Sequence, residues 1–491
     1  MQTSRARLVL LGGSLAGILG VSLFASACTR ACRGSGCESE FAAARVGVMP
    51  GGDTFSSGVH APLDAPWQVE GTLALGPDWS VALGPGGLVA GSPDDAAVRV
   101  FSSVTRGVLP AASADTTLVS DRADLRFGAA LDIVPDLDGD GVAELFVGAP
   151  EDRRSDLTRH DGAAWILSGA AAAAGGEQSA DDSSLVILVG DDEGGELGQV
   201  VAGCPNLEGD GRGGVVVAAP LDSSVDSLGG RIAVAPPSAL AGRTGRMELS
   251  TLSHVYTGVG IGARAGTSID CRSDLDGDGI SDIVVGAPFA DGTWEAEGTI
   301  HVLSGAALPG PTTLMVAATR VLSGLGEQHW AGWAVATGDL DGDGQPDLAA
   351  GAPGADDGAG MVLIWLGADL FTTRDGFPDV RLYGDEKGDG FGRSVSIADT
   401  DGDGLDDLLV GAPRRNPSPK DNPEFFDSGA LYLFRGAPEL RTWRPVLFAD
   451  DADARWAQAG QFLRTGHRVA AGDIDGDGAA EVALVHRFAP E

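Results

Sequence analysis

The sequence predicts an all-β protein made of repeated small sheets, and three observations lead to this prediction. A short apolar fragment that ends in Gly-Ala-Pro, or in a weaker version of it, recurs seven times. The apolar runs around it are four to six residues long and bounded by Gly and Pro, which is typical of strands. The 75 glycines supply the positive φ angles that many tight turns need.

The charge of the chain limits its partners. The 491 residues include 70 acidic and 33 basic residues, which gives a net charge of −37. We expect no nucleic-acid partner, because binding to phosphates requires a basic face. A hydrophobic content of 43% excludes a mainly disordered protein. The excess acid fits a solvated acidic surface or carboxylates that bind metal, and the motifs below favour both together.

The N-terminal segment 1–27 is predicted to be an export signal. Arg5 and Arg7 precede an apolar run over residues 8–25. The Ala-Ser-Ala-Cys that ends this segment resembles a bacterial lipobox, although Ala stands three residues before the cysteine where that pattern usually has Leu. We expect a lipoprotein with its lipid on Cys28. Ordinary signal cleavage and an uncleaved membrane anchor are the alternatives.

Residues 28–44 form a Gly/Ser-rich tether, and residues 45–491 are predicted to form the folded domain. Cys32 and Cys37 in the tether could close a small disulfide loop. The protein is therefore expected outside the cytoplasm, anchored by its lipid to a membrane of the cell envelope, or otherwise secreted.

The repeat has a constant order of parts. A Phe-Gly-like start leads into a short apolar segment, an acidic glycine-rich loop, the Gly-Ala-Pro strand, a third apolar run and a fourth segment. This order predicts a four-stranded blade with variable loops. The Gly-Ala-Pro fragments are residues 145–150, 283–288, 348–353 and 408–413, with weaker copies at 88–93, 215–220 and 482–485.

Phe-Gly, an acidic loop and Gly-Ala-Pro in this order resemble the FG-GAP repeat of integrin α-subunit heads and many bacterial secreted proteins. The resemblance covers roughly residues 67–491 and implies a seven-bladed β-propeller. The last copy ends at Glu491, just after its second strand. We therefore expect residues 45–49 and 67–75 to complete the last blade, which would join the ends and hide exposed strand edges.

Five copies carry the loop D-x-D-G-D-G-x-x-[DE] between the first and second strands. Carboxylates at positions 1, 3, 5 and 9, with the backbone carbonyl at position 7, predict about five Ca²⁺ sites. The carboxylates are Asp136, Asp138, Asp140 and Glu144; Asp274, Asp276, Asp278 and Asp282; Asp339, Asp341, Asp343 and Asp347; Asp399, Asp401, Asp403 and Asp407; and Asp473, Asp475, Asp477 and Glu481. Position 7 is Val142, Ile280, Gln345, Leu405 or Ala479.

Two other interpretations of these loops were weighed. An EF-hand needs Glu at position 12, and here that position is apolar and lies in the Gly-Ala-Pro strand. Asp-Gly pairs could also serve only as turns. Five loops in phase, each with four carboxylates, would carry strong like-charge repulsion without a cation, which favours structural calcium.

Two repeats depart from the pattern. The third loop lacks an acid at position 9, and the first loop has no ligands, so we expect both blades to fold without metal. Cys204 and Cys271 stand just before the loops of the third and fourth repeats. A disulfide between them would join two blades, and two buried free thiols are the alternative.

The sequence predicts a binding protein and no enzyme. It contains no nucleophile elbow, phosphate-binding loop or zinc-binding helix motif. The leading hypothesis is a binding or adhesion module for a protein or glycan partner. A structural scaffold of the envelope is the alternative, followed by an enzyme with a site in the central channel.

Loops after the Gly-Ala-Pro strands lie on the face opposite the acidic loops, where ligand-binding residues are expected. Arginines with aromatic residues there suggest an anionic or glycan partner, and solvated loops are the alternative. The candidates are Arg153, Arg154, Arg159, Trp294, Arg414, Arg415, Phe425 and Phe426.

Overall fold

The computed structural model describes a nearly all-β chain. The described residues are 6–9, 44–49, 58–60, 69–71 and 80–487, the last range with gaps at 85–86, 103–112, 123–124, 153–160, 192–193, 372–375, 417–426, 442–445 and 458–463. Cys28, Cys32 and Cys37 lie outside the described residues. None of the helices in the described part of the chain is long and apolar enough to span a membrane.

The strands form seven small sheets, which we number in chain order. Sheet 1 contains β5 (Ser80–Gly84), β6 (Gly87–Ser92), β7 (Ala97–Phe101) and β8 (Thr116–Val119). Sheet 2 contains β9 (Ala130–Val134), β10 (Glu144–Ala149), β11 (Ala163–Leu167) and β13 (Ser184–Val189). Sheet 3 contains β14 (Val200–Cys204), β15 (Gly214–Ala219), β16 (Arg231–Ala235) and β18 (His254–Thr257).

The later sheets repeat the same antiparallel order. Sheet 4 contains β19 (Ser268–Asp270), β20 (Ile283–Ala287), β21 (Thr299–Leu303) and β23 (Arg320–Ser323). Sheet 5 contains β24 (Ala334–Gly338), β25 (Asp347–Ala352), β26 (Met361–Trp365) and β27 (Val380–Tyr383). Sheet 6 contains β28 (Ser394–Ala398), β29 (Asp407–Ala412), β30 (Ala430–Phe434) and β32 (Ala454–Ala457).

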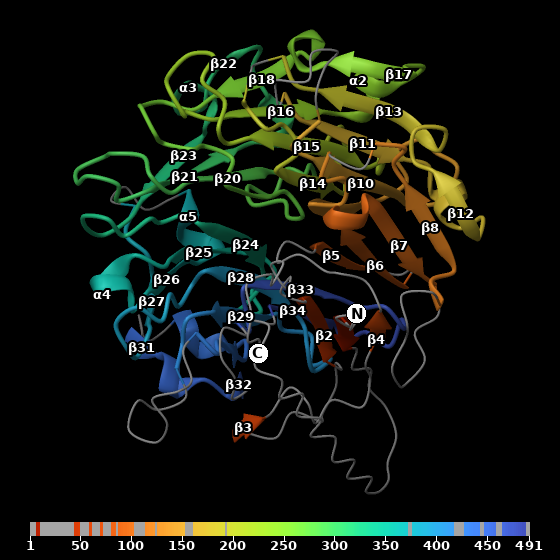
Figure 1. Ribbon diagram of the computed structural model, residues 1–491. Helices are drawn as coiled ribbons and strands as arrows, with labels where there is room; N and C mark the ends of the chain where they lie inside the picture. The colour runs from red at the N-terminus through yellow and green to blue at the C-terminus, as the bar shows by residue number, and fades with distance from the viewer. Residues whose placement is uncertain are drawn as a thin grey trace, which may run out of the picture.

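The sheets are arranged around a common centre (Figure 1), toward which their first strands face. Each first strand contacts the first strand of the next sheet, and β33 (Arg468–Gly472) of the last sheet contacts β5 of the first. The predicted all-β propeller is therefore confirmed. Five helices of four residues each lie outside the sheets: α1 (Gly169–Ala172), α2 (Pro237–Leu240), α3 (Leu314–Ala317), α4 (Ala355–Gly358) and α5 (Gly367–Leu370).

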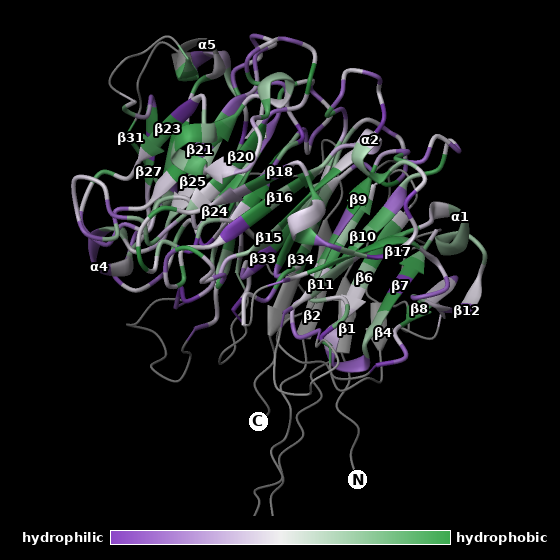
Figure 2. Ribbon diagram, turned by 90° about the horizontal axis from the view of Figure 1, so that it is seen from above, coloured by the Kyte–Doolittle hydropathy of each residue, from purple (hydrophilic) through white to green (hydrophobic). Residues whose placement is uncertain are grey.

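The hydrophobic core lies between consecutive sheets. Six clusters of buried apolar side chains are described, and each joins one sheet to the next. Val98 and Leu118 of sheet 1, for example, share a cluster with Val147 and Trp165 of sheet 2. Figure 2 shows the hydrophobic colour on the strands and the hydrophilic colour on the loops. Burial on both faces explains why the second strands read as continuous apolar runs.

The two glycines of the repeat meet between neighbouring sheets. A Cβ added to Gly351, in the Gly-Ala-Pro strand of sheet 5, would lie 1.9 Å from the carbonyl oxygen of Gly392. Gly392 has a φ of 84° and opens the first strand of sheet 6. The pair Gly411 and Gly466 repeats this contact between sheets 6 and 7, at 2.0 Å. Glycine is therefore needed here because two backbones touch.

In the described structure a fifth strand ties sheets 1, 2, 3, 5 and 6 to the sheet that follows each of them, whereas sheet 4 has four strands. The connection between the third and fourth strands of a sheet carries a short strand that pairs in parallel with the outer strand of the preceding sheet. We call these strands latches. They are β12 (Gly176–Ser179) on β8, β17 (Gly245–Glu248) on β13, β22 (Thr312–Thr313) on β18, β31 (Val446–Phe448) on β27, and β3 (Gly58–His60) on β32.

The last sheet combines both ends of the chain. Strand β2 (Ala44–Met49) pairs with β34 (Glu481–Arg487), as the closure hypothesis expects. Of the expected second segment, β4 (Val69–Gly71) belongs to the same sheet. Strand β1 (Ala6–Val9) lies between β2 and β4 and was not predicted. It belongs to the predicted export signal, so cleavage of that signal would remove it.

Replacement of Gly351 by Ala is expected to lower the free energy of unfolding by about 1–3 kcal/mol, because the new methyl group would overlap the Gly392 carbonyl. Urea unfolding in excess calcium measures this loss. Gly310→Ala is the matched control, since a Cβ there meets nothing within 4 Å. Equal stability of the two variants would contradict the role of the glycine contact.

Candidate metal centres and the opposite face

The five acidic loops lie between the first and second strands of sheets 2, 4, 5, 6 and 7, so all five lie at the same end of the strands. In each loop, three carboxylates offer oxygen atoms within 4.8 Å of one another. In four loops these are the acids at positions 1, 3 and 9: Asp274, Asp276 and Asp282; Asp339, Asp341 and Asp347; Asp399, Asp401 and Asp407; and Asp473, Asp475 and Glu481. In sheet 2 they are Asp136, Asp138 and Asp140 at positions 1, 3 and 5.

The loop backbone fixes the carboxylate at position 1. In sheet 5, Gly342 and Gly344 donate N–H groups to the two oxygens of Asp339, each at 2.8 Å. Both glycines have positive φ, 72° and 82°, which turns these N–H groups toward the carboxylate. The loops of sheets 4, 6 and 7 repeat this pattern. In these four loops the Asp-Gly sequence therefore orients the first acid of the cluster.

The position-5 acids of those four loops are outside the clusters of three. Each accepts a hydrogen bond from the backbone N–H of position 7, as Asp343 does from Gln345 at 2.7 Å. The other three are Asp278, Asp403 and Asp477, at 2.9 Å each. The structure thus brings together three of the four acids that the sequence assigned to each site.

The carboxylate at position 9 is buried. Asp347 has no exposed surface, and its oxygens accept N–H groups from Leu340, at 2.9 Å, and from Gly367 after the third strand, at 2.7 Å. In the two loops with glutamate, Glu144 and Glu481, one oxygen accepts a loop N–H and Oε1 is buried without a hydrogen-bond partner among the described residues. A buried oxygen of this kind costs about 1–3 kcal/mol unless something binds it.

Burial also changes the ionisation of position 9. Burial, assisted by the neighbouring carboxylates, raises the pKa of Glu144, Asp347 and Glu481 to about 7. The same causes raise the pKa of Asp282 and Asp407 to about 6. Without a cation these groups hold protons close to neutral pH, and a divalent cation would displace them. The donor set of carboxylate oxygens fits a hard cation such as Ca²⁺.

The cluster in sheet 6 includes an internal cation that the sequence did not reveal. Arg435, just after β30, forms an ion pair with Asp401 at 2.7 Å. Asp401 is the position-3 acid of this loop, and its Oδ1 is buried without a hydrogen-bond partner among the described residues. Part of the negative charge of this cluster is therefore already neutralised.

The third loop is held without an acidic cluster in the described structure. Asn206 accepts the N–H of Gly211 at 3.0 Å and donates to the carbonyl of Gly279, in the next loop, at 2.8 Å. Asp210 forms an ion pair with Arg212 at 2.7 Å. The contacts described here are those of a turn, and the expectation that this blade folds without metal stays a prediction.

Cys204 and Cys271 form a disulfide between sheets 3 and 4. Both sulfur-bearing residues are buried, with exposed fractions of 0% and 1%, inside the apolar cluster that joins these sheets. The disulfide lies beside the third loop, so a covalent link accompanies the loop that lacks the acidic cluster.

The opposite face carries three of the predicted ligand residues in the described structure. Trp294 is 53% exposed, and Arg414 is also exposed. Arg415 instead turns inward, 4.0 Å from Asp385 and over the ring of Tyr432, so its contacts are with the protein itself. Arg153, Arg154, Arg159, Phe425 and Phe426 lie outside the described residues.

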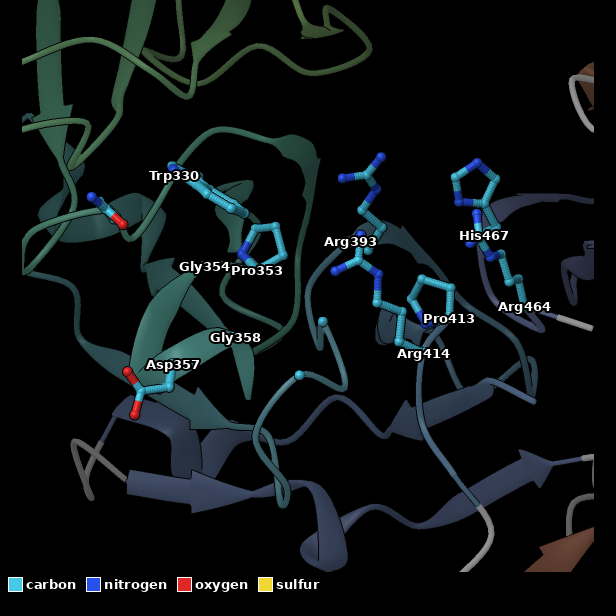
Figure 3. Close-up of a pocket in the computed structure, with 13 residues that line it drawn as sticks. Trp330, Pro353, Gly354, Asp357, Gly358, Arg393, Pro413, Arg414, Arg464 and His467 are labelled. Carbon is cyan, nitrogen blue, oxygen red and sulfur yellow. The ribbon is translucent and has the colours of Figure 1, made fainter. Parts of the chain in front are cut away.

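Arg414 lines a cavity of about 300 Å³ between sheets 5, 6 and 7 (Figure 3). Four other residues of its wall were not predicted from the sequence: Trp330, Arg393, Arg464 and His467. Arg393 and His467 each directly follow the glycine of a Phe-Gly-like start. That position could have been found from sequence, because in repeats 2 to 7 its residue differs each time while the glycine before it is kept.

Comparison with known proteins connects this architecture to a family. The FG-GAP repeat model matches residues 127–167, 265–303, 331–365 and 391–434. The chain is 31% identical over 202 residues to integrin alpha-PS2 of Drosophila melanogaster, which is 40% of this chain and 13% of that protein. It is 30% identical over 174 residues to phosphatidylinositol-glycan-specific phospholipase D of Rattus norvegicus, 32% of this chain and 19% of that protein.

Mouse (Mus musculus) integrin alpha-8 is 31% identical over 165 residues, which covers 33% of this chain and 14% of that protein. The chain thus spans less than a fifth of these relatives. Among solved structures it is similar to BBS1N in complex with ARL6DN, with a TM-score of 0.43 at 10% identity, covering 85% of this chain and 94% of the other. The Dos1 propeller has a TM-score of 0.41 at 10% identity, covering 85% and 82%. Four repeats of the chain thus match the FG-GAP repeat, and the chain is similar to integrin alpha proteins over part of its length.

Proposed function

We propose that this chain is a calcium-stabilised propeller that works outside the cytoplasm as a binding or adhesion module for a protein or glycan partner. The observation that carries the proposal is the set of five carboxylate clusters at one end of the strands. If these clusters bind calcium for stability, the loops at the other end are free to bind a partner. The similarity to integrin alpha proteins supports the adhesion class.

Calcium would be held by the acids of each loop at positions 1, 3, 5 and 9 and by the position-7 carbonyl. The clusters of three, and the buried oxygens of Glu144 and Glu481 that have no hydrogen-bond partner in the described part of the chain, support this assignment. The cation would join the loop to the start of the second strand, where position 9 lies. Its role is structural: it neutralises carboxylates that the fold has already brought together.

The location is proposed from the N-terminal sequence. Cleavage before Cys28 and lipidation of its thiol would leave the tether of residues 28–44 between the membrane and the propeller. Mass spectrometry of the mature N-terminus tests this directly. A diacylglyceryl-modified Cys28 is the expected result, and a mature chain that begins elsewhere would contradict the lipid anchor.

Removal of calcium is expected to lower the free energy of unfolding by about 2–7 kcal/mol at 1 mM calcium, if five sites bind with Kd of about 10⁻⁴–10⁻³ M. Urea unfolding of the protein, with calcium or with chelator, measures this. Magnesium at the same concentration is the control. Equal stability with and without chelator would contradict structural calcium.

Opposite dependences on pH are expected with chelator and with calcium. In chelator, the raised pKa values of about 6–7 mean that the folded protein binds more protons than the unfolded chain, whose Asp and Glu titrate at 3.8 and 4.5. Stability should therefore rise as pH falls from 7.5 to 5. In calcium, protons compete with the cation, so the stabilisation by calcium should shrink over the same range. Melting temperatures at each pH test both trends.

The substitution Glu481→Gln distinguishes loss of metal binding from loss of folding stability. The amide can still accept the N–H of Ile474, so in chelator the variant should be as stable as the parent or more stable. In calcium it should lose about 0.4–1.4 kcal/mol, the contribution of one site. Glu177→Gln is the control, because Glu177 is exposed and belongs to β12, outside the acidic loops. A loss of equal size in chelator and in calcium would contradict metal binding by Glu481.

A structural scaffold without a specific ligand is the alternative, followed by an enzyme. Pull-down of envelope proteins and glycan-array binding, each with calcium and with chelator, separates the first two. Calcium-dependent capture of a defined partner is expected for the binding module. Calcium-dependent stability without any capture would favour the scaffold.

A further inference from the structure

The position after each Phe-Gly glycine lies at the mouth of the central channel, on the face opposite the acidic loops. Gln199, Thr267, Trp333, Arg393 and His467 occupy this position in sheets 3 to 7, and all five line a central cavity of about 380 Å³. The first strand begins at this end and leads away toward the acidic loop. The glycine is fixed by packing, so the next residue can vary without cost to the fold.

In sheets 6 and 7 this position is basic, and further arginines surround it. Arg393, Arg414 and Arg464 line the cavity of about 300 Å³, together with His467. Arg393 lines both this cavity and the central one. Three arginines thus converge on one cavity of a chain whose net charge is −37. We call this cavity the arginine pocket.

Arg393 is held by packing against an aromatic ring. Arg393 lies over the ring of Trp333, 3.8 Å from its centroid. Arg464 forms a 3.4 Å ion pair with Asp427. Among the described residues, no ion pair involves Arg393 or Arg414. Burial and the charges of Arg414, Arg464 and Arg468 lower the pKa of Arg393 to about 10. A bound anion would reduce the repulsion among these positive charges.

The opposite wall of the pocket is apolar. Figure 3 shows Trp330 and Pro353 on one side, facing the side from which Arg393, Arg414 and Arg464 project. The only carboxylate among the residues that line the pocket is Asp357, and it is exposed and forms an ion pair with Lys387. The described pocket therefore offers guanidinium donors beside an aromatic surface.

We propose that the arginine pocket binds an anionic group, a carboxylate or a sulfate or phosphate ester, with Arg393 at its centre and Arg414 and Arg464 beside it. Guanidinium groups present paired donors that match such oxyanions. Trp330 and Pro353 contact the apolar part of the molecule that carries the anion. This deepens the proposed function, because it gives the partner an acidic group and places it at the channel mouth.

Calorimetric titration of the mature chain in 1 mM calcium and low salt, with sodium sulfate and separately with sodium glucuronate, tests the proposal. Binding of at least one anion is expected, and Arg393→Gln should weaken it at least tenfold. Arg414→Gln should weaken it in the same direction. The two probes distinguish a tetrahedral from a planar oxyanion. Absence of binding for both probes would overturn the proposal.

Arg243→Gln is the matched control, because it removes one positive charge from an exposed arginine on sheet 3, outside the pocket. Equal weakening by Arg243→Gln and Arg393→Gln would show an effect of net charge alone and would overturn the site. Arg393→Lys keeps the charge but loses the paired donors, so intermediate affinity is expected.

The melting temperature and the partner capture described above are two further measurements that keep the result interpretable. The melting temperature of Arg393→Gln in calcium should not fall, because the substitution removes like-charge repulsion in the cavity. Failure of the anion titration overturns the pocket but leaves the partner capture described above untouched. Failure of capture, with intact anion binding, overturns the adhesion module and leaves the pocket.

Discussion

The structure depends on a backbone contact between neighbouring sheets: the glycine of the Gly-Ala-Pro strand lies against the carbonyl of the next Phe-Gly glycine, and in sheet 3 Ala218 takes the place of that glycine. Gly351 with Gly392 and Gly411 with Gly466 show the contact. Ser394 strengthens it by donating a hydrogen bond to the carbonyl of Gly466, at 2.8 Å. Because this contact is made by backbone atoms of a second strand and of the glycine before the next first strand, the side chain that follows this glycine is left to line the channel. The repeat motif therefore determines the distance between neighbouring sheets, and this role does not depend on any ligand.

Charge is separated along the strands. The acidic loops collect buried carboxylates at one end, where position 9 joins the loop to the strands of its own sheet. At the other end, Arg393 and its neighbours form a local basic pocket. A fold that concentrates charge at both ends requires ions or partners to balance it, and the two ends call for ligands of opposite sign.

The sequence predicted the features that depend on residues close to one another along the chain. The acidic loops and second strands, such as Asp339 to Asp347 and β25, follow from spacing and apolar runs within about ten residues. The arginine pocket did not follow, because Arg393, Arg414 and Arg464 meet only after sheets 6 and 7 pack together. The latches also went unseen, since Gly176–Ser179 is polar and pairs with Thr116–Val119, sixty residues earlier in the chain.

The latches imply an order in which the sheets are completed during synthesis. Sheets 1, 2, 3 and 5 have their outer edges covered by chain that is synthesised later, so each of these edges stays uncovered until the covering segment has been made. Sheet 6 is different: its latch, β3, precedes every one of its own strands. That segment is synthesised before all of sheet 6. It can pair with β32 only after nearly the whole chain has been made. Assembly of the ring therefore ends where translation began.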